Sequence, residues 1–244
     1  ITDAFNKMLA RMKVLDESRS EFVSNVSHEL KTPMTSMKVL ADSLVGQQGV
    51  PEDLYQEFMR DITAEIDREN RIITDLLTLV KMDKKNADLQ IQHMSINQLL
   101  EDILKRLRPI ADKRNIDLIL DSFRPVEADV DELKFTSAIS NLVENAIKYN
   151  VDDGWVRVSL DADHKFFYVT VADSGMGIPE DSLSRIFERF YRVDKSHSRE
   201  IGGTGLGLAI TRSTIGMHHG VIKVFSKEGE GTTFSVRVPL SYIP

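Results

Sequence analysis

Apolar residues in the first part of the chain follow the seven-residue period of a coiled-coil helix. They recur at alternating steps of four and three, with one step missing, at Ile1, Phe5, Met8, Met12, Leu15, Phe22 and Val26. The next two steps, to Leu30 and Met34, are both four residues long, which locally changes the winding of a supercoil. Pro33 lies in this stretch and lacks a backbone donor, so we predict a long helix with a bend there.

A second helical pattern runs from about residue 52 to residue 85, after a turn at residues 46–51. Its apolar face consists of Tyr55, Phe58, Ile62, Ile66, Ile73, Leu76 and Val80. Two long amphipathic helices cannot bury both of their faces alone, so we predict that they pair with a second copy in a dimeric four-helix bundle. The alternative is an antiparallel α-helical hairpin that packs on its own second domain.

From residue 88 onward the pattern changes to shorter elements, after a polar boundary at residues 86–88. Helices are predicted over residues 96–114, 131–149 and 206–219. Strands are predicted over residues 89–94, 116–120, 126–130, 155–160, 166–172, 221–226 and 232–238. Residues 155–160 and 166–172 are expected to pair antiparallel. This order indicates an α+β sandwich with one sheet and helices on one of its faces.

Composition narrows the possible functions. The net charge of −7 argues against a nucleic-acid partner, because such binding needs clustered Lys and Arg. Cysteine is absent, which excludes disulfides, thiolate metal sites and a cysteine nucleophile. No apolar run approaches the roughly 18 to 20 residues that span a bilayer. A chain that begins at Ile1 is expected to be part of a longer one, so any membrane attachment would lie in an upstream segment.

His28 lies two positions after Val26, about 200° around the helix, and should therefore face solvent. Glu29 follows it directly, and Thr32 lies one turn further along the same face. A single histidine on a helix surface is usually only a surface residue. The zinc-protease motif of two histidines four residues apart is excluded, because position 32 is threonine.

Two features of the second domain suggest a nucleotide site. The helix predicted over residues 131–149 carries a polar ridge of Asn141, Glu144, Asn145, Lys148 and Tyr149. Amide and carboxylate oxygens can hold Mg²⁺ and a lysine can meet phosphate, although a solvated helix face is the simpler interpretation.

The second feature is a pair of glycine-rich segments, 173–179 and 202–208, joined by a long polar segment that we interpret as a lid. Its apolar anchors are Ile186, Phe187, Phe190 and Tyr191. The second glycine-rich segment leads directly into a helix, whose first N–H groups favour phosphate. Neither the dinucleotide fingerprint nor the P-loop is present.

Taken together, these motifs resemble the sensor histidine kinases of two-component signalling. Residues 22–33 look like the phosphoacceptor box, 141–149 the N box, 173–179 and 203–208 the two glycine boxes, and 187–192 the F box. Lys31 and Met34 stand where the family often carries Arg and Leu. The resemblance implies the end of a HAMP linker over residues 1–16, a dimerisation and histidine phosphotransfer domain over 17–87, and a catalytic ATP-binding domain of the Bergerat type over 88–244.

The resemblance also implies the chemistry. His28 would take the γ-phosphoryl group of ATP, Glu29 would accept the ring proton, and Thr32 would help to hydrolyse the phosphorylated partner. Asn145 would bind Mg²⁺, and Asp173 would accept a hydrogen bond from the adenine amino group. The implied nucleotide-binding residues are Asn141, Asn145, Lys148, Tyr149, Asp173, Gly175, Gly177, Arg192, Gly203, Thr204, Gly205, Leu206 and Gly207.

The implied partners are a second copy of the chain and the receiver domain of a response regulator. The implied location is the cytoplasmic portion of a bacterial cell-membrane sensor kinase. Two alternatives stay open at this point. One is a Bergerat-fold ATPase or clamp that hydrolyses ATP with water, and the other is a degenerate kinase that acts as a scaffold or mainly as a phosphatase.

Overall fold

The computed structural model describes residues 2–45, 49–82, 89–193 and 203–243. The chain divides into two compact units, residues 1–76 and 77–244. Some of the predicted features therefore lie wholly or partly outside the described residues: position 1, the turn at 46–51, the boundary at 86–88, the later part of the lid, and position 202.

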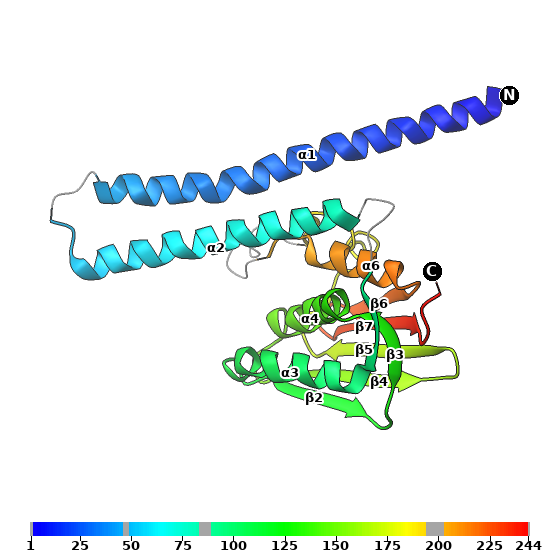
Figure 1. Ribbon diagram of the computed structural model, residues 1–244. Coiled ribbons are helices and arrows are strands. Elements are labelled where there is room, and N and C mark those ends of the chain that lie inside the picture. The colour runs from blue at the N-terminus through cyan, green and yellow to red at the C-terminus, as the bar shows by residue number, and fades with distance from the viewer. Residues whose placement is uncertain (1, 46–48, 83–88, 194–202, 244) are drawn as a thin grey trace. The chain divides into compact units, whose positions relative to one another are not determined.

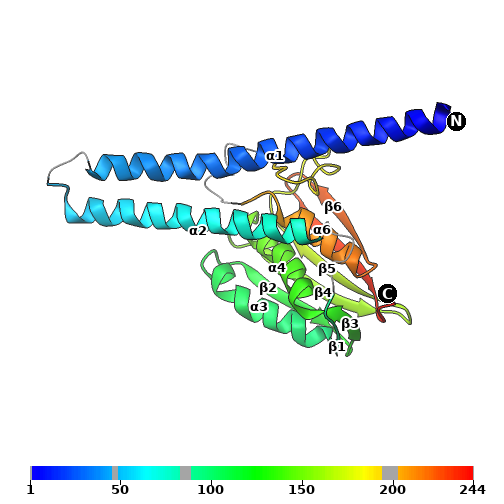
Figure 2. The same cartoon turned by 45° about the horizontal axis from the view of Figure 1, so that its top comes forward.

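The first unit is a helical hairpin. Helix α1 spans Thr2–Val45 and helix α2 spans Glu52–Met82, with the last residues of α2 belonging to the second unit. The two helices run antiparallel and side by side in both views (Figures 1 and 2). Pro51 precedes α2, and Glu52 and Asp53 lie in its first turn, where acidic side chains favour a helix start. The predicted pair of long helices is therefore present.

Helix α1 continues without interruption through Pro33. Proline has no N–H to donate to the carbonyl of Glu29 one turn earlier. The hydroxyl of Thr32 donates to the carbonyl oxygen of His28 at 3.0 Å, so a side chain also contacts the helix backbone at this turn. The same type of side-chain bond occurs at Ser27 and Thr35, so the turn around His28 is distinguished by the backbone donor that Pro33 lacks.

A seven-residue period of apolar side chains on α2 is left uncovered within the single chain. Met59, Ile66 and Ile73 are 41%, 44% and 42% exposed. Polar residues would be expected at these positions if the hairpin were complete as a monomer. The apolar face is therefore broader than one chain buries.

The second unit is built on a five-stranded sheet. Its strands are β2 (Asp117–Ser122), β4 (Trp155–Ala162), β5 (Phe166–Asp173), β7 (Gly231–Pro239) and β6 (Val221–Lys227), in that spatial order. The β2–β4 pair is parallel, and the other neighbours are antiparallel. Helices α3 (Ile96–Asp112), α4 (Glu132–Lys148) and α6 (Gly207–Met217) lie on one face of the sheet (Figure 1).

The prediction of a single sheet was wrong. Strands β1 (Ile91–Ser95) and β3 (Glu127–Asp131) form a separate two-stranded antiparallel sheet. The two strands flank α3 and β2 in the sequence, so their pairing is non-local and leaves no mark in either strand's own pattern. All the other predicted strands and helices are present, with ends that differ by a few residues.

The core of the second unit lies between the sheet and α4. Alternate residues of β5, namely Phe167, Val169 and Val171, are fully buried, as the period of two requires. They meet the apolar side of α4, where the ring of Phe135 packs edge-on against Phe167 at 5.6 Å. Helix α4 is thus held firmly along one side, which leaves its opposite edge free for polar residues.

The first part of the predicted lid packs against this core. Ile186 is only 6% exposed, and Phe187 meets the ring of Phe234 edge-on at 6.3 Å. The hydroxyl of Tyr191 donates to Ser182 at 3.0 Å. The apolar residues of this segment are therefore anchors, as the sequence indicates.

In the part of the chain that the structure describes, no helix combines the length and the apolar character needed to cross a membrane.

Candidate functional site

The polar ridge predicted on α4 lies along the edge of that helix. Asp131 caps the helix by accepting the N–H of Lys134 at 3.0 Å, and the buried face that follows fixes the helix rotation. Asn141, Asn145 and Lys148 are half-buried, whereas Glu144 is exposed. The amides and the lysine therefore border a partly enclosed surface, which the solvated-face interpretation did not anticipate.

Asp173 is the last residue of strand β5, and the hydrogen bonds described for its carboxylate both reach one of its two oxygens. Its Oδ1 accepts the N–H of Gly175 at 2.8 Å and the N–H of Thr232 at 3.2 Å. The side chain is buried, and this burial raises the pKa of the carboxyl, against the opposing effect of the two N–H donors. Both of these hydrogen bonds end on Oδ1, so Oδ2 offers a rigidly oriented acceptor.

The first glycine-rich segment packs closely against its surroundings. Tyr149 at the end of α4 accepts the N–H of Met176 at 3.0 Å, and a side chain at Gly175 would collide with that same carbonyl. Gly177 has a φ of +71°, and a Cβ there would collide with the carbonyl oxygen of Lys227. Glycine is therefore required at both positions, by close approach at one and by backbone conformation as well at the other.

The second glycine-rich segment meets the polar ridge of α4. A Cβ at Gly203 would lie 2.8 Å from the Nζ of Lys148. The amide of Asn141 donates to the carbonyl of Gly207 at 3.4 Å. Gly205, with a φ of +68°, accepts the N–H of Phe190 at 2.8 Å and so links this segment to the lid. Residues more than 50 positions apart are thereby brought together.

The start of α6 adds backbone donors to this cluster. The N–H of Leu206 donates to the Oγ1 of Thr204 at 3.2 Å, and the helix that follows has no side-chain cap. Uncapped N–H groups at a helix start are suited to an anion. Because the Leu206 side chain is fully buried, only its backbone could touch a ligand.

Two cations stand near Tyr149. The Nζ of Lys148 lies 5.2 Å from the centre of the Tyr149 ring. Burial raises the pKa of the Tyr149 hydroxyl, and the positive charge of Arg192 partly opposes that shift. Positive charge of this kind favours phosphate groups.

His28, Glu29 and Thr32 lie on α1, in the other unit. His28 and Thr32 are exposed, and Glu29 is half-buried. The prediction that His28 faces solvent is confirmed. A shallow groove begins beside the histidine and follows the helix, lined by His28, Lys31, Thr32, Thr35, Ser36, Val39 and Leu40.

One contributor to the site was missed by sequence reasoning. The N–H of Thr232 orients Asp173, and Gly231 beside it has a φ of +98° and lies against the Asp173 carbonyl. The sequence could not reveal this contributor, because a backbone donor has no residue-type signature.

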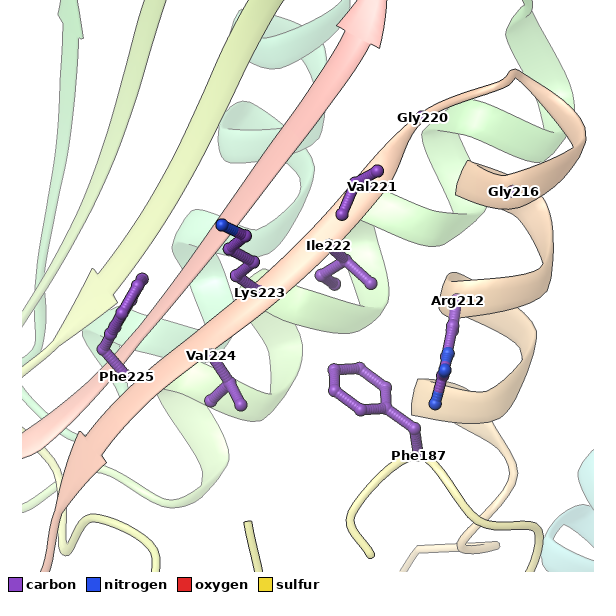
Figure 3. Close-up of a pocket in the computed structure, with 9 residues that line it drawn as sticks. All are labelled: Phe187, Arg212, Gly216, Gly220, Val221, Ile222, Lys223, Val224 and Phe225. Carbon is purple, nitrogen blue, oxygen red and sulfur yellow. The ribbon is translucent and has the colours of Figure 1, made fainter. Parts of the chain in front are cut away.

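A separate apolar groove lies between α6 and the edge strand β6 (Figure 3). Ile222 and Val224 line one side, while Phe187 and Arg212 stand opposite, with the guanidinium 5.5 Å from the ring centre. None of the residues predicted to bind nucleotide lines this groove. The groove is therefore separate from the predicted nucleotide-binding residues.

Two family models match the chain, one in each half. Residues 18–85 match the His Kinase A (phospho-acceptor) domain. Residues 130–242 match the histidine kinase-, DNA gyrase B-, and HSP90-like ATPases. The chain therefore joins a phosphoacceptor domain to an ATPase domain.

The curated relatives indicate which group of kinases this domain pair belongs to. Sensor histidine kinase WalK of Bacillus subtilis is 35% identical over 228 residues, which are 92% of this chain and 37% of that relative. The sensor-like histidine kinase SenX3 of Mycolicibacterium smegmatis is 35% identical over 225 residues, 92% of this chain and 58% of that relative. The chain belongs to the sensor histidine kinases of two-component systems. It spans 37% to 58% of the length of these relatives.

Solved structures show the same fold. The histidine kinase ThkA in complex with response regulator protein TrrA has a TM-score of 0.75 at 24% identity, over 95% of this chain and 63% of that chain. The Acinetobacter baumannii histidine kinase AdeS has a TM-score of 0.69 at 21% identity, over 87% and 98%. The predicted fold class, a helical hairpin followed by a Bergerat-type α+β sandwich, is confirmed.

Proposed function

We propose that this chain is the kinase portion of a sensor histidine kinase that transfers the γ-phosphoryl group of ATP to His28 and then to an aspartate of a response regulator. The observation that carries the proposal is the pairing, in one chain, of an exposed histidine on a phosphoacceptor helix with an ATPase domain. Dephosphorylation of the regulator, with Thr32 helping to position water, is part of the same proposal.

In the second unit, Asp173 would recognise the base. Its Oδ1 is held by two backbone N–H groups, so the remaining oxygen can accept the adenine amino group. Gly175 and Gly177 let this segment pack directly against the backbone of Tyr149 and Lys227, which fixes it beside the Asp173 carboxylate. These features fit an adenine nucleotide, because a rigidly held carboxylate oxygen can accept a hydrogen bond from the amino group of the base.

At the phosphate end, Lys148 and Arg192 supply positive charge, and Gly203, Gly205 and Gly207 let the backbone approach closely. The amide oxygen of Asn145 would hold Mg²⁺, with Asn141 beside it. Bound Mg²⁺ would supply charge neutralisation on the phosphate oxygens. Thr204 and the N–H groups at the start of α6 would complete the phosphate contacts.

In the first unit, a neutral ring nitrogen of His28 would form the bond to the γ-phosphorus while the bond to the β-phosphate oxygen breaks and ADP leaves. Glu29 would accept the proton from the other ring nitrogen. The proposed domain bounds are residues 17–87 for phosphotransfer and 88–244 for catalysis, with residues 1–16 as the end of a HAMP linker.

The proposed partners are a second copy and a receiver domain. The exposed apolar period on α2 supports a homodimer. The similar kinase ThkA was solved in complex with a response regulator protein, which supports the same kind of partner here. Attachment to a bacterial cell membrane, through a segment upstream of residue 1, is also proposed because the curated relatives are sensor kinases.

The test is incubation with ATP labelled at the γ position, followed by treatment of the protein with acid and alkali. We expect label that is labile in acid and stable in alkali, as a phosphoramidate requires, and its loss in His28→Gln. The control is His164→Gln, which changes an exposed histidine of the other unit. Label that persists in His28→Gln would remove the assignment of His28.

A second experiment examines the nucleotide site and the ATPase alternative. Asp173→Asn should weaken Mg·ATP binding more than tenfold, because the adenine amino group loses its charged acceptor. Asn145→Asp should also weaken it, because it adds a negative charge beside the phosphate groups. An ATPase or clamp would release phosphate from ATP without labelling the protein. Unchanged nucleotide affinity in both variants would mean that the nucleotide binds elsewhere.

A further inference from the structure

The last turn of α4 carries much of the proposed nucleotide site, and its backbone carbonyls all need partners. A helix end leaves its final carbonyl groups without intrahelical donors. The carbonyl of Asn145 accepts the N–H of Tyr149 at 2.9 Å. The carbonyl of Ala146 accepts the side-chain amide of Asn150 at 3.0 Å. The next carbonyls accept from a side chain in a different part of the domain.

That side chain is Arg114, in the turn between α3 and β2. One of its terminal nitrogens, Nη1, donates to the carbonyls of Ile147 at 2.9 Å and Lys148 at 3.0 Å. The other, Nη2, donates to the carbonyl of Asn150 at 2.7 Å. The Nε donates to Asp152 at 3.0 Å, so the planar fork is held on several sides. A cation at the negative end of a helix is also favourable.

Arg114 is itself well anchored. Its carbonyl accepts the N–H of Asp153 at 3.3 Å. The neighbouring Asn115, with a φ of +54°, donates its amide to the Asp153 carboxylate. The turn that carries Arg114 is therefore joined to residues 150–154 through both main chain and side chain. The guanidinium therefore contacts the end of α4 from a turn that is itself fixed by hydrogen bonds.

We propose that Arg114 is a positioning residue for the nucleotide site, which it sets by holding the last turn of α4. Lys148 and Tyr149 belong to this turn, and Tyr149 accepts the N–H of Met176 from the first glycine-rich segment. Gly203 of the second segment lies against the Nζ of Lys148. A displacement of the turn therefore moves a phosphate-binding lysine and both glycine-rich segments together. The inference rests on the proposed function and adds a residue that does not touch the nucleotide.

The experiment measures binding of Mg·ADP to the full chain by calorimetry, together with autophosphorylation rates over a range of ATP concentrations. Arg114→Ala should weaken binding roughly tenfold, the effect of losing about one charge-assisted hydrogen bond. The KM for ATP should rise by a similar factor, while the rate at saturating ATP stays close to that of the unchanged protein. Arg114→Lys should recover part of the affinity, since a lysine can reach a carbonyl but cannot form the fork.

Two control variants separate the carbonyl contacts from general effects. Asp152→Asn removes the ion pair of Arg114 and keeps its carbonyl contacts, so affinity should not change. Arg124→Ala removes another arginine–aspartate pair of the same domain, to Asp161 at 2.7 Å, and should also leave affinity unchanged. An arginine that only stabilises the fold would lower the amount of active protein, and hence the maximal rate, without raising the KM.

The outcomes are distinguishable. Normal Mg·ADP affinity in a folded Arg114→Ala or Arg114→Lys overturns this inference and leaves the proposed function intact. If Arg114→Ala does not fold, Arg114→Lys decides in the same way. Absence of Mg·ADP binding in the unchanged protein overturns the proposed function and this inference together.

Discussion

At the scale of single residues, Asp173 shows a cost that function imposes on stability. Burial raises the pKa of its carboxyl, so the charged form is disfavoured in the folded protein relative to the unfolded chain. A group with a raised folded pKa contributes stability below its ordinary pKa and loses that contribution as pH rises through the folded value. At neutral pH the charge on Asp173 therefore destabilises the domain.

The prediction is that Asp173→Asn raises the melting temperature at pH 7 although it weakens nucleotide binding. The amide oxygen can still accept the N–H groups of Gly175 and Thr232. The gain should shrink as the pH is lowered from 7 towards 4, where the carboxyl of the unchanged protein becomes protonated. Thermal melts over this pH range measure it. A variant that is less stable than the unchanged protein at pH 7 would contradict the argument.

His218 gives the opposite dependence. It is almost fully buried, and burial lowers the pKa of its ring. Its Nδ1 donates to the carbonyl of Thr214 at 2.8 Å, and its Nε2 accepts the N–H of Asp131 at 2.9 Å, so the ring is neutral. A proton added at Nε2 would face the Asp131 N–H donor. Lys134 and His219 also disfavour the charged ring, whereas Asp131 favours it.

Because the folded pKa is lowered, His218 contributes stability above its ordinary pKa of about 6.5 and loses it as pH falls below that value. We predict that stability declines between pH 7.5 and 5.5 with a slope from this residue of at most about 1.4 kcal/mol per pH unit. His218→Gln should be less stable overall but show a smaller slope. His164→Gln, which changes an exposed histidine that does not act on His218, should keep the original slope. Chemical denaturation at several pH values gives the free energy of unfolding of each variant and its slope with pH.

At the scale of elements, the first glycine-rich segment is held by the turn between β6 and β7. The N–H of Gly229 donates to the carbonyl of Met176 at 2.7 Å, and the N–H of Ile178 donates to Ser226 at 2.8 Å. This turn therefore supports the segment that lies beside the proposed adenine site. At Gly177 the two segments lie so close that a Cβ would collide with the carbonyl oxygen of Lys227.

A matched pair of substitutions tests this support. Gly177 and Gly229 have φ values of +71° and +79°, so alanine at either one meets backbone strain of about 1–2 kcal/mol. A Cβ at Gly229 has nothing within 4 Å, whereas one at Gly177 collides with the Lys227 backbone. We predict that Gly177→Ala costs about 1–3 kcal/mol more than Gly229→Ala and weakens nucleotide binding. Equal losses of melting temperature would show that the close packing is unimportant.

The elements themselves were largely predictable, because their signals are local. Helix α4 follows from Phe135, Ile139 and Leu142 at helical spacing, and β5 from strict alternation. Contacts between distant elements were not predictable from pattern. The donors that Arg114 directs to α4 lie at least 33 positions from their acceptors, and Arg114 itself reads as an ordinary turn residue. The pairing of β1 with β3 was missed for the same reason.

At the scale of the whole molecule, the candidate site residues were predicted because several short motifs occur in one order along the chain. Each set then lies within its own unit, with His28, Glu29 and Thr32 on α1 and the nucleotide residues around α4. Within the second unit, the structure brings both glycine-rich segments to the end of one helix. Spacing along the chain could not show that convergence, because it depends on strands that pair far apart in sequence.

The exposed apolar row on α2 of the first unit predicts a contact between two copies of the chain. Met59, Ile66 and Ile73 repeat at seven-residue steps on α2, and each is more than 40% exposed in the single chain. Burying them against a second copy stabilises the pair by roughly 25 cal/mol for each Å² of apolar surface removed from water. A charge at two of these positions would instead be desolvated at the contact, which is strongly unfavourable.

We therefore expect sedimentation to give the mass of two chains for the unchanged protein and of one chain for Ile66→Glu combined with Ile73→Glu. The matched control is Ala64→Glu combined with Arg71→Glu, at exposed positions on another side of the same helix. This control should remain a dimer, because those positions lie about 160° away from the apolar row. If the first pair of substitutions leaves the dimer intact, the apolar row on α2 is not the contact between copies. If the unchanged protein is a monomer, the exposed apolar row on α2 is not a contact between copies of this chain.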